Sequence, residues 1–117
     1  MRHRQKGKTL DRKKQPRSLL IRNLASSLIL YEKVRTTDAR AKAVQSFVEK
    51  IISLGLQGGL TSRRNLIRVL PVKSAVAKVM EDLSQRYKNR RGGYTRIVKL
   101  SRRQGDGAKM VYLELVD

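Results

Sequence analysis

The amino-acid sequence predicts an α+β fold: a two-layer α/β domain with about four helices packed on a small sheet, made of a short strand plus a C-terminal hairpin. Four segments have apolar residues at the spacing of one helix face: 17–31, 38–54, 61–70 and 72–87. Three segments instead have the β-branched or alternating pattern of strands: 33–37, 94–100 and 109–116. Because the apolar face of so small a sheet needs a cover, we expect the helices to form one layer on it.

The first predicted helix begins just after Pro16, because a helix tolerates proline best in its first turn. We expect its inward face to contain Leu20, Ile21, Leu24, Ala25, Leu28 and Tyr31. Its outer face then contains Ser18, Arg22 and Ser26. The segment KVRTT at 33–37 follows as a short strand or extended link.

The second predicted helix starts directly after this strand. Thr37 or Asp38 can cap it, and an acidic residue in the first turn suits the helix dipole. Its apolar stripe consists of Ala43, Val44, Phe47, Val48, Ile51 and Leu54. We expect Gly55 to end this helix in the left-handed conformation, with residues 57–59 continuing the break as a flexible loop.

Two more helices and a hairpin complete the predicted domain. Thr61 or Ser62 caps the third helix, and Pro71 separates it from the fourth. The inward residues of the fourth helix are Val72, Ala75, Val76, Val79, Met80, Leu83 and Tyr87, with Met80 and Tyr87 interpreted as core packing. In the hairpin, Val111, Leu113 and Leu115 share one face, and a long basic tip containing the turn residues 105–107 joins the strands.

The composition limits what the chain can be. Its 117 residues suit one domain, and the low aromatic content of 4% without Trp indicates an aliphatic core. Without Cys there is no disulfide, thiolate zinc site or cysteine nucleophile. The apolar runs are too short for a transmembrane span or a secretory signal. The net charge of +19 makes polyanions the expected partners.

The positive charge is concentrated in blocks. Residues 1–17 carry eight Lys or Arg against one acid and show no periodicity, so we predict a basic arm there and one globular domain over 18–117. The alternative for the arm is a solvated tail without a partner. Residues 86–103 carry eight more cations and no acid, and Arg63, Arg64 and Arg68 form a smaller cluster. A partner that neutralises these blocks is the simplest explanation for them.

The residues that catalysis would need are missing or isolated. Glu81 and Asp82 are neighbours on a helix and diverge in direction, so they are interpreted as surface charges. His3 is the only imidazole and has cations on both sides, which disfavours a metal. Gly92 and Gly93 fit no nucleotide-binding fingerprint. We therefore predict no enzyme activity, no metal, no cofactor and no small-molecule substrate.

Phosphate binding is the chemistry that remains. Arginine presents a rigid fork to phosphate, and Gly92 and Gly93 let the backbone approach a sugar–phosphate chain closely. Tyr94 either stacks on an unpaired base or covers the edge of the core. An extended basic arm favours the clefts of a large folded RNA, although such arms also enter the minor groove of DNA.

The sequence resembles one known family along its whole length. It begins MRHR, has RNLA at 22–25 and KVRTTDARAK at 33–42, carries the Arg63-Arg64 pair, and ends with GGYTRI at 92–97 and GDGAKMVYLEL at 105–115. Six such strings in this order and spacing resemble the bacterial large-subunit ribosomal protein family L-seventeen.

The resemblance implies a structural part of the 50S subunit that binds 23S ribosomal RNA and adjoins other 50S ribosomal proteins near the peptide exit region. It implies no catalytic role, and the family start at Met1 favours a bacterial cytoplasmic ribosome over an imported precursor. The expected RNA-binding residues are Arg2, His3, Arg4, Lys6, Lys8, Arg12, Lys13, Lys14, Arg17, Arg22, Asn23, Lys33, Arg35, Thr36, Thr37, Lys42, Arg63, Arg64, Arg90, Arg91, Gly92, Gly93, Tyr94, Thr95 and Arg96.

Two other function classes stay open at this point. A nucleoid-type or regulatory DNA-binding protein would also need the basic blocks, and preference for duplex DNA over ribosomal RNA would identify it. A cationic membrane-surface protein would need cations along one helix face, but here most cations lie outside the predicted helices, so no membrane partner is expected.

Overall fold

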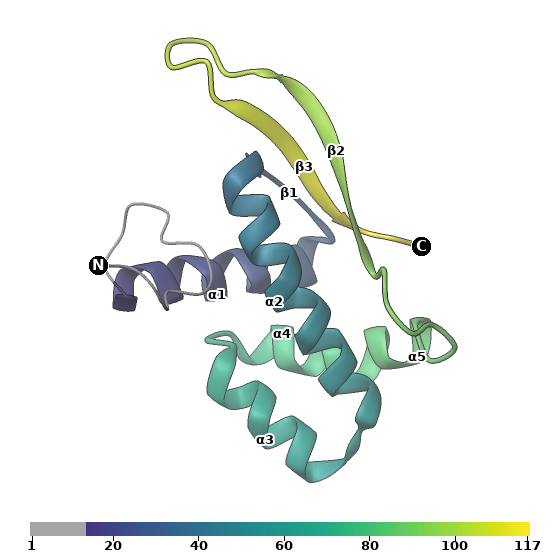
Figure 1. Cartoon of the computed structure of the whole chain (residues 1–117). Coiled ribbons are helices and arrows are strands. Elements are labelled where there is room, and N and C mark those ends of the chain that lie inside the picture. The colour runs from purple at the N-terminus through teal and green to yellow at the C-terminus, as the bar shows by residue number, and fades with distance from the viewer. Residues whose placement is uncertain (1–13) are drawn as a thin grey trace, which may run out of the picture.

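The computed structural model describes residues 14–117, and its elements follow the predicted order along the chain (Figure 1). They are α1 (Lys14–Tyr31), β1 (Lys33–Thr37), α2 (Asp38–Gln57), α3 (Gly59–Val69), α4 (Lys73–Lys78), the π-helical turn η1 (Val79–Leu83), α5 (Ser84–Arg86), β2 (Thr95–Arg102) and β3 (Lys109–Leu115). The three strands form an antiparallel sheet in the order β1-β3-β2. The predicted α+β class is confirmed.

The helices lie on one side of the sheet. Both α1 and α2 contact β1 and the central strand β3, and α2 also reaches β2. The helical segment from α3 to α5 packs at the far end of α2, while the β2–β3 hairpin extends past the other end of α2, where that helix begins (Figure 1). The hairpin tip therefore projects from the helical layer.

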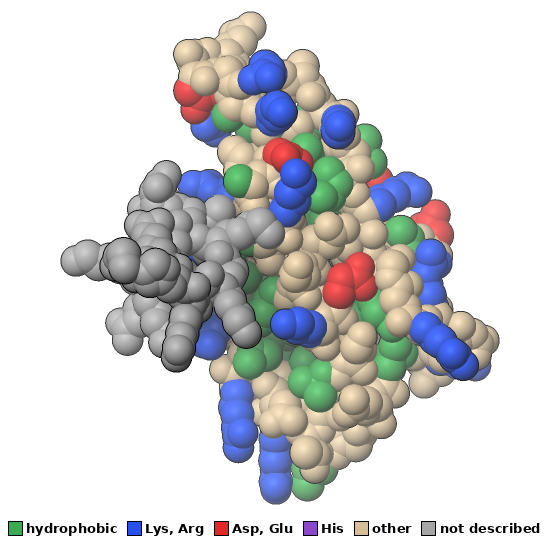
Figure 2. All heavy atoms as spheres, in the orientation of Figure 1, with side chains coloured by type: hydrophobic (Ala, Val, Ile, Leu, Met, Phe, Trp, Pro, Cys, Tyr) green, Lys and Arg blue, Asp and Glu red, His purple; other side chains and the backbone are tan. Residues whose placement is uncertain are grey.

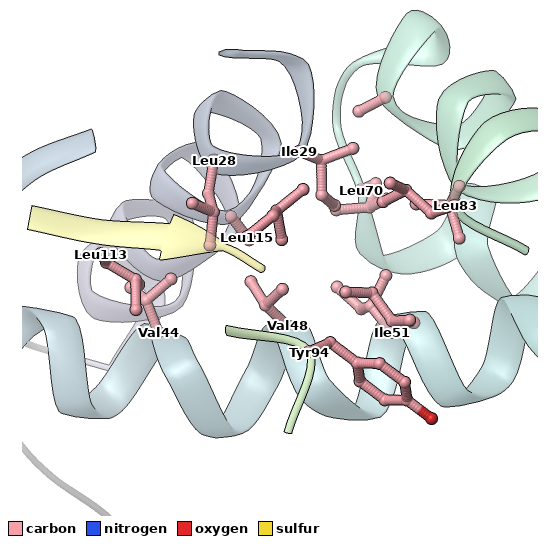
Figure 3. Packing of buried hydrophobic residues seen from close by; sticks show 14 of the residues in the cluster. Leu28, Ile29, Val44, Val48, Ile51, Leu70, Leu83, Tyr94, Leu113 and Leu115 are labelled. Atoms are coloured by element: carbon pink, nitrogen blue, oxygen red, sulfur yellow. The ribbon is translucent and has the colours of Figure 1, made fainter. Parts of the chain in front are cut away.

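The core fills the space between the helices and β3 (Figure 3). Leu28 and Ile29 come from α1, Val48 comes from α2, and Leu113 and Leu115 come from β3. The core is aliphatic, as predicted, except for Tyr87 and Tyr94, which are among the largest fully buried side chains. The rings of Tyr87 and Tyr94 lie 5.2 Å apart, centroid to centroid, with their planes tilted by 47°.

Helix α1 differs from the prediction at its start and on its faces. It begins at Lys14, so residues 14–17 of the predicted arm are helical. Ser26, predicted to face outward, is only 2% exposed, and its buried hydroxyl is satisfied by donating to the carbonyl of Arg22 in the same helix at 3.0 Å. Tyr31, predicted to face inward, is 75% exposed, and Ile29 is buried in its place.

Helix α2 starts as predicted and ends later. The Thr37 hydroxyl accepts a hydrogen bond from the Arg40 amide at 3.4 Å, which confirms the cap. Gly55 does not end the helix but is buried inside it, and the position needs glycine because a Cβ there would clash with Cγ1 of Val79. Gly58 provides the left-handed backbone at the end, with φ 70°. The buried stripe is therefore shifted and consists of Ala41, Val44, Val48, Ile51, Ile52 and Gly55.

The remaining elements depart from the prediction in smaller ways. Helix α3 begins at Gly59 without the side-chain cap expected from Thr61 or Ser62. The fourth predicted helix is interrupted by the wider turn η1, which packs against α2. Its predicted inward residues Tyr87 and Met80 are respectively buried and packed against the core, so their core role is confirmed. Strand β2 extends to Arg102, which shortens the hairpin loop.

Candidate nucleic-acid interface

Acidic side chains in residues 14–117 are nearly all bound to partners within the fold. Six of them form ion pairs with Lys or Arg: Glu32, Asp38, Glu81, Asp82, Asp106 and Glu114. Figure 2 shows the result on one face, where Lys and Arg side chains are spread from the hairpin to the region of α3 with few Asp or Glu between them. The described surface is therefore available to an external polyanion.

Glu32 shows how an acid is used inside the fold. It joins α1 to β1, and its carboxylate accepts hydrogen bonds from Arg86 at 2.5 and 3.0 Å and from Lys78 at 2.9 Å. Lys78 also donates to the carbonyl of Leu30 at 3.2 Å. The hydrogen bonds from Arg86 and then Lys78 lower the pKa of Glu32 from 4.5 to about 2. This cluster fixes the fourth helical segment against the end of α1.

The depressed pKa of Glu32 predicts a loss of stability in acid. The stabilising contribution of the carboxylate is complete above pH 4.5 and disappears as the pH falls toward about 2. Because the side chain is 40% exposed, we expect Glu32→Gln to lower the free energy of unfolding by only about 1 kcal/mol at pH 7. Urea unfolding of the unaltered protein and of Glu32→Gln, measured between pH 7 and 2, should show that their difference in unfolding free energy shrinks as the pH falls. A constant difference would contradict the prediction.

Glu49 positions the basic loop that precedes β2. Its carboxylate accepts hydrogen bonds from the amides of Tyr94 and Thr95 at 3.2 and 3.1 Å, and from the Thr95 hydroxyl at 2.8 Å. The loop residues Arg90, Arg91, Gly92 and Gly93 are exposed, as a phosphate contact requires. Helix α2 thus holds the end of this arginine-rich loop through one half-buried carboxylate.

Tyr94 itself serves the core. Its side chain is 2% exposed, its ring packs on Tyr87, and its hydroxyl donates to the carbonyl of Arg90 at 3.1 Å. The structure therefore favours the core alternative, and stacking on a base does not fit a buried ring. Thr36 and Thr95 are also buried, so their side chains do not present groups to RNA in this conformation.

The outer face of the sheet brings together three predicted site residues. In the strand register, Lys33 and Arg96 lie on either side of Glu114, and Arg35 lies beside Tyr112 in the next row. Lys33 is 4.0 Å above the ring of Tyr112, whereas Arg96 is paired with Glu114 at 2.8 Å. Lys33 and Arg35 are exposed on the edge strand, where they can reach a phosphate.

The other predicted residues of the domain lie on separate elements. Arg22 and Asn23 are exposed on α1, where Arg17 is half-buried. Arg64 is exposed on α3, and its neighbour Arg63 lies 3.9 Å from Glu81. Two more belong to the β1–α2 junction, where Thr37 caps α2 and Lys42 pairs with Asp38 at 3.1 Å. The structure thus distributes the predicted site over several surfaces instead of forming one cleft.

Most predicted site residues of the basic arm lie outside residues 14–117. The described part of the chain does not include the following predicted site residues: Arg2, His3, Arg4, Lys6, Lys8, Arg12 and Lys13. Lys14 belongs to the first turn of α1, but its side chain is not described. Their part in RNA binding stays a prediction.

Three cations of the hairpin that are not among the predicted site residues lie together. Lys99, Arg102 and Lys109 border a pocket of about 560 Å³ between the hairpin and the start of α2. Lys99 and Arg102 belong to the basic block 86–103, but Lys109 lies outside it, and the strand register that brings Lys109 opposite Arg102 is not visible in the sequence. These residues extend the basic surface to the projecting tip.

The described residues also bear on other chemistries. Residues 14–117 contain no group of three or more His, Asp or Glu that could hold a metal ion. None of the helices that the structure describes is long and apolar enough to span a lipid bilayer.

Comparison with known proteins gives the same family for the whole chain. The family described as Ribosomal protein L17 matches residues 20–116. A large ribosomal subunit protein bL17 of Bdellovibrio bacteriovorus is 51% identical over 98% of the chain, which spans 64% of that longer protein. The bL17 proteins of Dehalococcoides mccartyi and Syntrophotalea carbinolica are 48% and 44% identical, over 99% and 100% of the chain and 99% and 76% of their own lengths. The resemblance inferred from the sequence is confirmed, and the chain belongs to the ribosomal protein L17 family.

Proposed function

We propose that the chain is a structural, non-catalytic constituent of the large ribosomal subunit and that it binds 23S ribosomal RNA through phosphate contacts largely independent of base sequence. Relatives that share 44–51% of its residues are large-subunit proteins. Membership of this family supports a role in translation on the bacterial ribosome.

The observation that carries the RNA contact is the unequal use of charge. Most acids of the described region are paired with groups of the chain itself, while exposed cations lie on α1, β1, α3, the loop before β2 and the hairpin. A surface of this kind is stabilised by many phosphates approaching from several directions, which is what folded RNA offers. We also propose that neighbouring proteins of the subunit, near the peptide exit region, are further contacts, as the resemblance to the family implies.

The basic arm is the part that we expect to enter the RNA. Deletion of residues 2–13, which precede α1, should leave the described fold intact but weaken incorporation into the large subunit, because six Lys or Arg are removed. Sucrose-gradient co-sedimentation, followed by washes of increasing salt, measures the weakening. Each phosphate that the shortened protein no longer neutralises should reduce the log–log salt slope by about 0.7–0.9 in a simple lattice.

A scrambled arm is the matched control for the deletion. It keeps the composition of residues 2–13 and should restore most of the incorporation if binding depends on charge rather than sequence. Normal incorporation of the deleted protein would contradict the role of the arm. A large preference of the intact protein for duplex DNA over ribosomal RNA fragments would contradict the proposed function itself.

A further inference from the structure

The pocket beside the hairpin is lined by both apolar and cationic side chains. It lies where β2 and β3 extend past the first turn of α2, and its volume of about 560 Å³ falls in the range of roughly 300–1,000 Å³ that is usual for small-molecule sites. Apolar side chains of Ile97, Leu100 and Met110 form one part of its lining, and Lys42, Lys99, Arg102 and Lys109 form another. An occupant that combines an apolar ring with negative charge would match both parts.

Three of the four cations of this pocket, Lys99, Arg102 and Lys109, form no ion pair with an acid among the described residues. Its one acid, Asp38, is already paired with Lys42 at 3.1 Å. Arg102 lies directly opposite Lys109 in the strand register, an arrangement that destabilises a sheet unless the charges are neutralised. Arg102 donates to the carbonyl of Gly107 at 3.0 Å, which holds its guanidinium in place without cancelling its charge. These three exposed cations therefore favour the binding of an anion from outside the chain.

The local backbone gives an independent indication. The register between β2 and β3 shifts between Lys99 and Arg102, so a bulge interrupts the pairing at this pocket. Bulges re-aim side chains and are over-represented near functional sites. Here the irregularity places Leu100 among the lining residues, although the regular part of β2 ends before it.

We propose that this hairpin pocket receives one unstacked nucleotide of the ribosomal RNA. Its phosphate binds Lys99, Arg102 and Lys109, and its base lies against the apolar lining formed with Ile97 and Met110. The proposal rests on the RNA-binding function proposed above and adds to it a site at which a base, and not only the backbone, is held. A phosphate alone would leave the apolar part of the pocket unused.

Methyl NMR of the full chain tests this with three probes. With isotope-labelled Ile and Met methyl groups, a single-stranded RNA octamer should shift the signals of Ile97 and Met110, because a nearby base imposes a ring current. Tripolyphosphate and an octamer of glutamic acid carry charge without a base and should leave these signals nearly unchanged. Equal shifts with tripolyphosphate would overturn the proposal in favour of a simple anion surface. Shifts with the acidic peptide alone would overturn it in favour of a protein partner.

A charge-matched pair of variants separates the pocket from general electrostatics. Lys99→Gln, Arg102→Gln and Lys109→Gln together should abolish the octamer-induced shifts and weaken RNA binding by about tenfold or more. The control variant removes three exposed cations elsewhere, through Lys50→Gln, Arg68→Gln and Lys73→Gln, and should keep the shifts. Circular dichroism verifies that both variants are folded. Retained shifts in the first variant would overturn the proposal.

Co-sedimentation distinguishes failure of the pocket from failure of the proposed function. If the unaltered chain co-sediments with the large subunit but its Ile97 and Met110 signals ignore the octamer, only the pocket proposal is overturned. If the unaltered chain does not co-sediment with the subunit at all, the proposed function is overturned and the pocket proposal with it.

Discussion

Replacement of Gly55 by valine is expected to lower the free energy of unfolding by about 3 kcal/mol or more, near the upper end for overpacked cores. Gly55 lies inside α2 and is buried against η1, where a Cβ would clash with Cγ1 of Val79. Val79 is itself fully buried and β-branched, so its side chain has little freedom to move away. Chemical denaturation followed by circular dichroism measures the effect.

Two further variants make the cause of this effect testable. Gly55→Ala gains about 0.5–1 kcal/mol of helix propensity, but we expect the clash to exceed this gain and leave a net loss. In the background of Val79→Ala, the same change should cost less, with a coupling of about 0.5–3 kcal/mol. If Gly55→Ala stabilised the protein in the presence of Val79, the close approach of α2 to η1 would not explain the glycine.

Replacement of Glu49 by alanine is the second large effect that we expect. It leaves the amides of Tyr94 and Thr95 without their acceptor at the start of β2. An unsatisfied donor costs about 1–3 kcal/mol, and we expect a total loss of about 2–3 kcal/mol because water reaches part of this half-buried site. Hydrogen exchange of the two amides should accelerate at the same time.

The surface pair of Arg63 and Glu81 is the matched control for Glu49. Its side chains are 43% and 73% exposed and lie 3.9 Å apart, so Glu81→Ala should change stability by less than about 1 kcal/mol.

RNA binding by the loop at 88–93 should weaken in Glu49→Ala, because the end of that loop is no longer anchored to α2. Equal stability losses in the two variants would contradict the anchoring role of Glu49.

The order of helices and strands was predictable because each apolar period is local. The predictions were wrong where tertiary packing determines the structure. Gly55, for example, is a residue type that often ends helices, and only its contact with Val79 explains its place inside α2. Likewise the chemistry of Tyr94 fits both a stacking and a core role, and its burial against Tyr87 separates them.

The charge pattern of the sequence indicated which residues belong to the candidate site, but not which of them lie together in the fold. Exposed Lys33 and Arg35 were expected from the resemblance, and the structure adds that they share a sheet face with Arg96. By contrast, Arg102 and Lys109 lie opposite each other only because the strand register includes a bulge. No pattern in the sequence therefore indicated the hairpin pocket.

The strand order β1-β3-β2 has a consequence for the molecule before it meets RNA. Among residues 14–117, it leaves β1 and β2 each with one side of the backbone unpaired, and such edges are the usual starting point for intermolecular sheet growth. Lys33 and Arg35 on one of these strands and Lys99 and Arg102 on the other make two copies repel along those margins. The cations that we propose for nucleic-acid binding would thereby also oppose edge-to-edge self-association of the free chain.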